Sequence, residues 1–120
     1  DQGLGSAMDF KLYQDLGRLL ENTVCLELIK HGKDIAYSIQ DLTECDFVVK
    51  KNNQIIEAIQ VTVHLEDQQT RNREIKGLIS TCKRYHLSQG IILCMDHDEE
   101  FSMEGIFIRV ISAWRYLLNL

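Results

Sequence analysis

The first part of the chain carries apolar side chains at the spacing of an amphipathic helix. Leucines, valine and isoleucine recur every three or four positions between Leu12 and His31, so they fall on one face of a helix. Gly32 comes next and favours a helix end, because glycine readily adopts the left-handed conformation with which many helices terminate. A helix is therefore predicted over residues 12–31.

Short runs rich in β-branched residues follow this helix and predict strands. They lie at residues 35–39, 45–50 and 55–63, and Asn52-Asn53 between the last two is typical of a hairpin turn. The remaining predicted elements are a helix at 66–86, a buried strand at 90–95, a hairpin or pair of edge strands at 101–110, and a short helix at 112–118 that Ser112 could cap. This order of elements predicts a mixed α/β sandwich.

Length and composition describe a single domain. The 120 residues are 45% hydrophobic and 26% charged, which is enough apolar material for one core and too little chain for two. Residues 1–7 read as the remnant of an expression tag, so we expect the domain at 8–120. The net charge of −5 argues against a broadly basic surface for nucleic acid and leaves room for a local basic groove. No apolar run is long enough to span a membrane, and none reads as a secretory signal.

Four cysteines lie far apart in the sequence, at positions 25, 45, 82 and 94. They form no C-x-x-C pair, and no histidine stands at zinc-site spacing from them. We therefore expect free, mostly buried thiols rather than structural zinc. Free thiols are typical of a reducing compartment, which indicates the cytoplasm.

Asp46 and Gln60 stand where two adjacent strands would bring them together. On the strand predicted at 55–63, Gln60 and Thr62 share one face. If this strand forms a hairpin with the preceding one, Asp46 and Gln60 point into the same space. Oxygen ligands of this kind suit a hard cation such as Mg²⁺, which activates water and stabilises the charge developing on a phosphate. The commoner interpretation is that both are polar residues at solvent-facing strand ends.

Two carboxylates of the first predicted helix also need an explanation. Glu21 lies at the flank of the apolar stripe, and Glu27 lies near its centre. A glutamate near an apolar stripe must find a partner, face a cavity or raise its pKa. For Glu27, a buried structural pairing, for instance with an arginine, explains the position at least as well as catalysis does.

Charge is distributed unevenly over the later elements. The second helix is the most basic stretch, with Arg71, Arg73, Lys76, Lys83 and Arg84. Such a helix can contact phosphate, but a solvated helix face is the commoner explanation. The acidic run at 96–100 predicts a solvated turn.

Six sequence blocks carry a resemblance that covers nearly everything from Tyr13 to Leu118. The blocks are Gly17–Val24, Glu44–Val49, Ile59–Thr62, Arg73–Leu78, Gly90–Leu93 and Val110–Trp114. In this order they resemble the uncharacterised C-terminal domain that follows the AAA+ module in a large group of prokaryotic ATPases. The chain itself has no G-x-x-x-x-G-K-[ST] motif, so ATP hydrolysis is not assigned to it.

That family is regarded as similar to the PD-(D/E)XK, or restriction-endonuclease-like, nucleases. The resemblance implies an αβββαβ sandwich with a central mixed sheet and flanking helices. It also implies a catalytic set of Glu21, Asp46, Gln60 and Thr62, with Asp46 and Gln60 as ligands of Mg²⁺ or Mn²⁺. Two departures weaken this chemistry, because Gln60 stands where an acid is usual and Thr62 stands where a lysine is usual.

Two functions follow, and whether the chain is an enzyme stays open between them. The first is a nuclease-fold accessory domain of an AAA+-type ATPase, associated with DNA or RNA, whose metal-dependent phosphodiesterase activity is degenerate or lost. The second is a catalytically inactive module for protein interaction or oligomerisation, which the net charge of −5 and the missing lysine favour. The expected partners are nucleic acid and an AAA+ module, in the same chain or in another; no membrane is expected.

Overall fold

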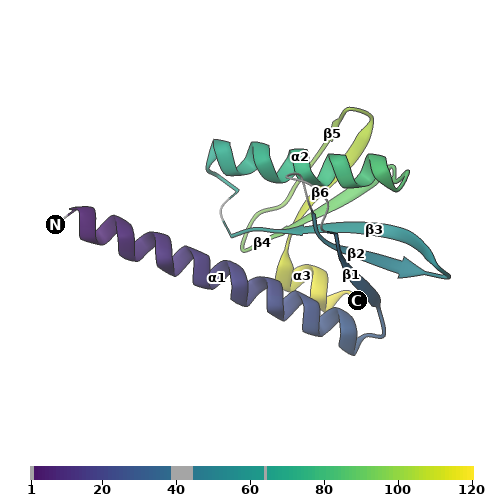
Figure 1. The fold of residues 1–120 in the computed structure, drawn as a ribbon, viewed down its shortest axis with the longest axis horizontal. Helices are drawn as coiled ribbons and strands as arrows, with labels where there is room; N and C mark the ends of the chain where they lie inside the picture. Colours follow the sequence, from purple (N-terminus) through teal and green to yellow (C-terminus); the bar gives the residue numbers. More distant parts are fainter. Residues whose placement is uncertain (1, 39–44, 64) are drawn as a thin grey trace.

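The structure is a computed structural model of the chain. It describes the backbone of residues 2–38, 45–63 and 65–120, and the side chains of residues 11–12, 14–36, 47–63 and 65–120. The elements of these residues, drawn in Figure 1, are α1 (Gln2–Lys30), β1 (Asp34–Ser38), β2 (Cys45–Lys51), β3 (Gln54–Val61), α2 (Gln68–Arg84), β4 (Gln89–Cys94), β5 (Glu99–Met103), β6 (Ile106–Ser112) and α3 (Ala113–Leu118).

A six-stranded mixed sheet forms the middle of the domain, in the order β1-β2-β3-β4-β6-β5. β2 is antiparallel to both of its neighbours, β1 and β3. β3, β4 and β6 run parallel to one another, and β5 is antiparallel to β6. α2 connects the parallel strands β3 and β4, as helices commonly do in such crossovers. The predicted mixed α/β class is confirmed.

The two hairpins lie where the sequence predicted them. Asn52 and Asn53 join β2 to β3 with φ angles of 55° and 64°, the left-handed pair that a tight type I′ turn requires. The turn between β5 and β6 uses Glu104 at φ 53° and Gly105 at φ 80°. Asparagine and glycine are the residues that tolerate this conformation best, so the turn chemistry agrees with the fold.

The helix bounds differ more from the prediction. α1 begins at Gln2, well before the predicted start at residue 12. The prediction missed this part of the helix because Gly3 and Gly5 weaken the helical pattern of the sequence. α2 is shorter than predicted at both ends, and Asp67 caps it by accepting a hydrogen bond from the Thr70 backbone nitrogen at 3.1 Å. Among the described residues, no helix is long and apolar enough to cross a membrane.

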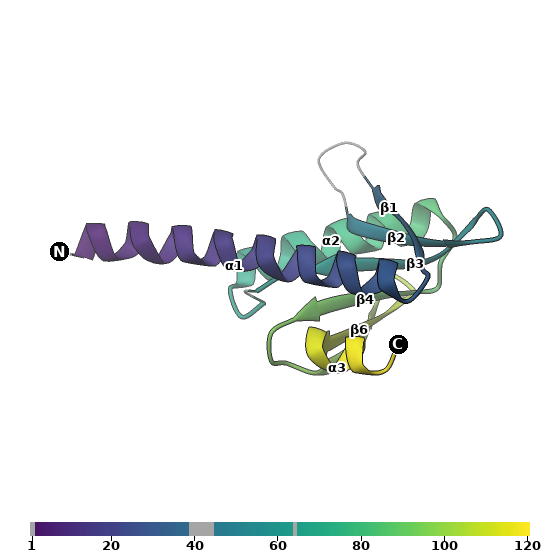
Figure 2. The ribbon, with the colours of Figure 1, turned by 90° about the horizontal axis from the view of Figure 1, so that it is seen from below.

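Side chains pack against both faces of the sheet. α2 covers one face, whereas α1 and α3 lie on the other (Figures 1 and 2). The core beneath α2 includes Leu78, Cys82 and Ile92, and the core beneath α1 includes Leu28 and Phe47; all five are 0% exposed. The N-terminal half of α1 extends beyond the sheet, as Figure 2 shows.

Candidate functional site

The carboxyl end of β3 carries the predicted site residues into the interior. β3 changes from exposed to buried along its length, and Gln60 near its end is only 6% exposed. The Gln60 side-chain nitrogen Nε2 donates a hydrogen bond to Oε2 of Glu74 on α2. Gln60 is therefore not a polar residue at a solvent-facing strand end, and it faces the α2 side of the sheet.

The antiparallel register of β2 and β3 supports the expected neighbourhood of Asp46 at the level of the backbone. Phe47 pairs with Ile59, and Asp46 and Gln60 are the next residues beyond that pair on their strands. Both positions therefore lie at the same end of the ladder. The Asp46 side chain lies outside the described side chains, so its predicted role stays a prediction.

Glu74 is a residue of this site that the sequence reasoning missed. Burial raises the pKa of its carboxyl group, while the hydrogen bond from Gln60 and the charge and hydrogen bond of Arg73 lower that pKa to a lesser extent. Arg73 Nη2 lies 3.7 Å from Glu74 Oε1. A signal was present in the sequence: Glu74 is the sole acid between residues 68 and 84, and it precedes buried Leu78 by one helical turn.

The first helix adds a second carboxylate from the opposite side. Burial raises the pKa of Glu21, and the negative charge of Glu21 raises the pKa of Glu74. The structure therefore brings Glu21, Gln60 and Glu74 into one electrostatic neighbourhood. Glu27 belongs elsewhere, because its half-buried carboxylate lies 3.4 Å from Lys30 Nζ and 3.9 Å from His31 Nε2. The described partners of Glu27 are therefore Lys30 and His31, and not an arginine in a buried pair.

Thr62 brings no cation to this neighbourhood. It is 8% exposed, and its backbone nitrogen donates to the Leu93 carbonyl oxygen at 2.9 Å. Lys83 forms its ion pair with Glu104 at the far end of α2 instead. Among the described side chains, a cation that does reach this neighbourhood is Arg73, whose Nη2 lies 3.7 Å from Glu74 Oε1.

The described side chains do not by themselves form a magnesium or manganese centre. Within the part of the chain that the structure describes, no group of three His, Cys, Asp or Glu side chains could hold a metal ion. Glu74 already accepts a hydrogen bond from the Gln60 amide, and an amide oxygen is a weaker ligand than a carboxylate for a hard cation. The Asp46 side chain is not among those described, so Asp46 and Gln60 as ligands of Mg²⁺ or Mn²⁺ stay a prediction.

We expect Glu74→Gln to raise the melting temperature by a few degrees near neutral pH and to leave it unchanged near pH 4. The folded-state pKa of Glu74 lies above its unfolded value, so its stabilising contribution is present below the unfolded pKa and is lost as the pH rises through the folded pKa. Glutamine is neutral throughout and keeps an oxygen that accepts from Gln60. Thermal unfolding at both pH values measures this, with exposed Glu100→Gln as the control. An equal gain at both pH values would contradict a titrating Glu74.

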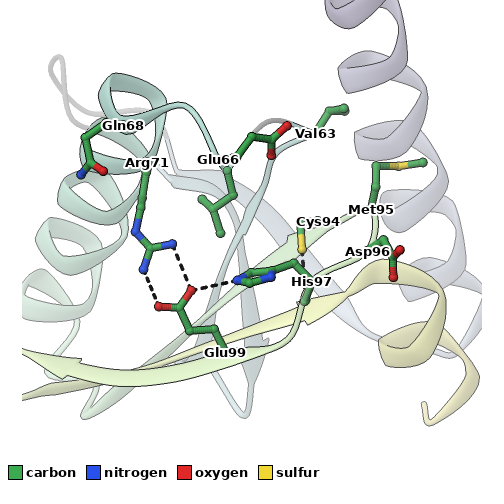
Figure 3. A pocket seen from close by; sticks show the side chains of 10 residues that line it. Val63, Glu66, Gln68, Arg71, Cys94, Met95, Asp96, His97 and Glu99 are labelled. Carbon is green, nitrogen blue, oxygen red and sulfur yellow. Dashed lines mark hydrogen bonds and ion pairs between the residues drawn. The ribbon is translucent and has the colours of Figure 1, made fainter.

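A second feature lies at the carboxyl ends of the parallel strands β3 and β4. It is a pocket of about 610 Å³ between the first turn of α2 and the segment that follows β4 (Figure 3). Its lining consists of Val63, Leu65, Glu66, Gln68, Arg71, Cys94, Met95, Asp96, His97 and Glu99. Ligands often bind at this edge of an open α/β sheet, so its side chains need individual inspection.

Three of the charged groups of this pocket are paired with one another, namely Arg71, His97 and Glu99. Arg71 donates from Nη1 and Nη2 to the two oxygens of Glu99 at 3.0 and 2.6 Å, and His97 Nε2 lies 2.9 Å from Glu99 Oε2. The hydrogen bonds from Arg71, then those from His97, hold the pKa of Glu99 below its ordinary value. Asp98 pairs with Arg115 at 2.8 Å. The run at 96–100 is exposed except at half-buried Glu99, in agreement with the predicted solvated turn, and Asp98 and Glu99 also form ion pairs there.

Cys94 does not make this pocket a catalytic centre. Its thiol donates to the His97 carbonyl oxygen at 3.3 Å, and burial raises the pKa of the thiol. A nucleophilic cysteine needs the opposite, a depressed pKa in an electropositive setting. What the structure does show at this pocket is an ion pair of Arg71 and Glu99 that joins α2 to β5.

The fold also occurs in a chain of a much larger solved assembly. A chain in the refined half-complex from the tetradecameric assembly of Thermococcus gammatolerans McrB AAA+ hexamers with bound McrC aligns with a TM-score of 0.62 at 12% identity. The alignment covers 86% of this chain and 32% of that chain, so the present chain spans about a third of its length. At such identity the likeness shows a shared fold. No curated protein matches the sequence.

One family model matches most of the sequence. It covers residues 16–116, from the middle of α1 into α3, and so includes Glu21, Asp46, Gln60 and Glu74. Its description is that of a domain of unknown function. The chain belongs to the DUF4143 family.

Proposed function

We propose that the chain is a nuclease-fold accessory domain of an AAA+-type ATPase that has lost phosphodiesterase chemistry and still associates with nucleic acid. Two observations support the ATPase setting: the family of unknown function and the shared fold with a chain from an assembly of AAA+ hexamers. The AAA+ module would lie in the same polypeptide or in a partner. The described cysteines Cys25, Cys82 and Cys94 are free thiols, which supports a cytoplasmic location.

The order of elements supports a PD-(D/E)XK-like scaffold. The first six elements are one helix, three antiparallel strands, a second helix and a parallel strand. This is the αβββαβ order that the sequence resemblance implies. On such a scaffold, Glu21, Asp46, Gln60 and Thr62 are the positions where the catalytic groups would stand.

The hydrogen bond between Gln60 and Glu74 is the observation that carries the loss of catalysis. An amide nitrogen at the position of the usual acid donates to a carboxylate, whereas a metal-binding acid would present lone pairs to the ion. Thr62 has no charge to orient or deprotonate a water molecule, and transition-state charge on phosphate requires such preorganised cations. Glu74 thus holds the Gln60 amide by a hydrogen bond at the position where a metal-binding acid would stand.

A nuclease assay tests this proposal directly. We expect purified wild-type protein with Mg²⁺ or Mn²⁺ to leave supercoiled, linear and single-stranded DNA and RNA intact, at the level of the Asp46→Ala control. Cleavage that depends on metal and disappears in Asp46→Ala would overturn the proposed loss of activity. It would also make Asp46 a ligand of an active centre.

The alternative is an inactive module for self-association, and one feature of α1 favours it. Leu12, Leu19 and Leu26 repeat at intervals of seven residues, and together with Ile29 they are 54–63% exposed. Such a stripe is typical of a helix that packs against another helix. Light scattering discriminates the two functions: a dimer that Leu19→Glu dissociates, without affinity for nucleic acid, would support the alternative.

A further inference from the structure

Positive charge is concentrated on α2 although the protein is acidic. The chain has 13 lysines and arginines and a net charge of −5. Five of these cations lie on α2, whose only acid is Glu74. Since Glu74 faces Gln60 beneath the helix, the outward surface of α2 carries cations without acids from its own helix.

The three exposed cations of α2 lie along one side of the helix. Arg73, Lys76 and Lys83 are exposed, with side-chain exposures of 74% for Arg73 and 54% for Lys83. At about 100° and 1.5 Å per residue, they fall within an arc of about 80° and along about 15 Å of the helix. We call these three residues the α2 ridge. Arg71 does not belong to it, because its guanidinium turns inward to Glu99.

The ion pairs of the ridge leave its cations available. Lys83 pairs with Glu104 on the turn between β5 and β6, and both side chains are more than half exposed. Arg73 Nη2 lies at the longer distance of 3.7 Å from Glu74. A pair exposed on both sides, as Lys83 and Glu104 are, contributes little free energy, typically about 0–1 kcal/mol. A polyanion can therefore displace Glu104 from Lys83, and the Arg73 side chain is itself 74% exposed.

The chemistry of the ridge fits the phosphate backbone of a nucleic acid better than it fits a protein. Protein interfaces have an apolar centre, but the exposed residues beside these cations are polar, namely Gln69 and Asn72. A line of about 15 Å spans about four phosphates of one strand in a duplex, at about 3.4 Å per phosphate along the axis. We infer that the α2 ridge is the surface through which this domain contacts DNA or RNA phosphates. This inference rests on the nucleic-acid association proposed above and names the surface responsible for it.

Salt dependence of binding tests the inference. Fluorescence anisotropy with a labelled DNA duplex in EDTA measures affinity without any cleavage. Three phosphate contacts predict a slope of about −2.7 for log K against log salt, hence a loss of about 40-fold between about 50 and 200 mM KCl. The triple variant Arg73→Gln, Lys76→Gln, Lys83→Gln should bring this slope close to zero, and each single change should reduce it by about 1.

A second triple variant controls for net charge. Arg18→Gln, Lys30→Gln and Lys33→Gln remove the same charge from exposed positions on and after α1, on the opposite face of the sheet. This variant should retain the wild-type slope. Equal losses in the two triple variants, or no binding by folded wild-type protein at low salt, would overturn the inference. Equal competition by polyglutamate would overturn it in favour of an acidic protein partner. Metal-dependent cleavage by the wild type would instead overturn the proposed loss of catalysis and leave the ridge unaffected.

Discussion

Gly90→Ala is expected to destabilise the domain by about 1–3 kcal/mol, although it adds a single methyl group. A Cβ atom at Gly90 would lie 2.9 Å from Cys82 Sγ and 2.9 Å from Leu78 Cγ. Both neighbours are 0% exposed in the core beneath α2, so neither can move aside without disturbing other side chains. Gly90 thus allows β4 to approach α2 closely, and this approach sets the height of the helix over the sheet.

Gly17→Ala is the matched control for this prediction. Apart from Gly17 itself, its chain neighbours and the adjacent helix backbone, no described atom lies within 4 Å of a Cβ built at Gly17, which is inside α1. Alanine in a helix interior is more favourable than glycine by about 1 kcal/mol, so this variant should gain stability. Urea unfolding of both variants measures the pair of effects. If Gly90→Ala unfolds at the same urea concentration as the wild type, the close packing of β4 against α2 is wrong.

Local sequence patterns predicted the elements whose signals are local. The hairpin at Asn52 and Asn53 follows from the left-handed preference of asparagine, and the helix over α2 follows from its apolar spacing. Ser112 shows the limit of this reasoning. It does stand at the N-cap of α3, but its hydroxyl makes no capping bond and is buried without a hydrogen-bond partner in the structure. The Ser112 backbone nitrogen instead donates to Asp98 at 3.4 Å.

The site was only partly predictable because its contacts join distant elements. Strand alternation predicted Gln60 and Thr62 on one face, since a strand has a fixed period of two; β3 itself ends at Val61. It could not show that α2 crosses that face with Glu74 directed at Gln60, which depends on how the helix packs. The ion pair of Glu99 could not be predicted for the same reason, because its partner Arg71 lies 28 residues earlier in the chain. Predicting such pairs requires the register of α2 over the sheet.

Phe47→Ala is expected to cost about 3–5 kcal/mol, the largest loss among the substitutions considered. Phe47 is 0% exposed and belongs to the core beneath α1, with Val24 and Leu28 of that helix and Ile59 of the neighbouring strand. Truncation removes the aromatic ring and leaves a cavity that α1 can close only by shifting toward β2. Because Phe47 directly follows Asp46 on β2, this anchor also fixes the strand that carries the predicted metal ligand.

Phe107→Ala provides the same chemical change at a less buried position. Phe107 on β6 is 36% exposed, so its truncation should cost about 1 kcal/mol. Equilibrium urea unfolding of both variants gives the comparison, and equal m-values would show that the same structure unfolds. Equal losses would contradict the packed core beneath α1. A large loss confined to Phe47→Ala would instead mean that α1 is an integral layer of the domain, so that Glu21 is held at its place near the end of β3 by the core itself.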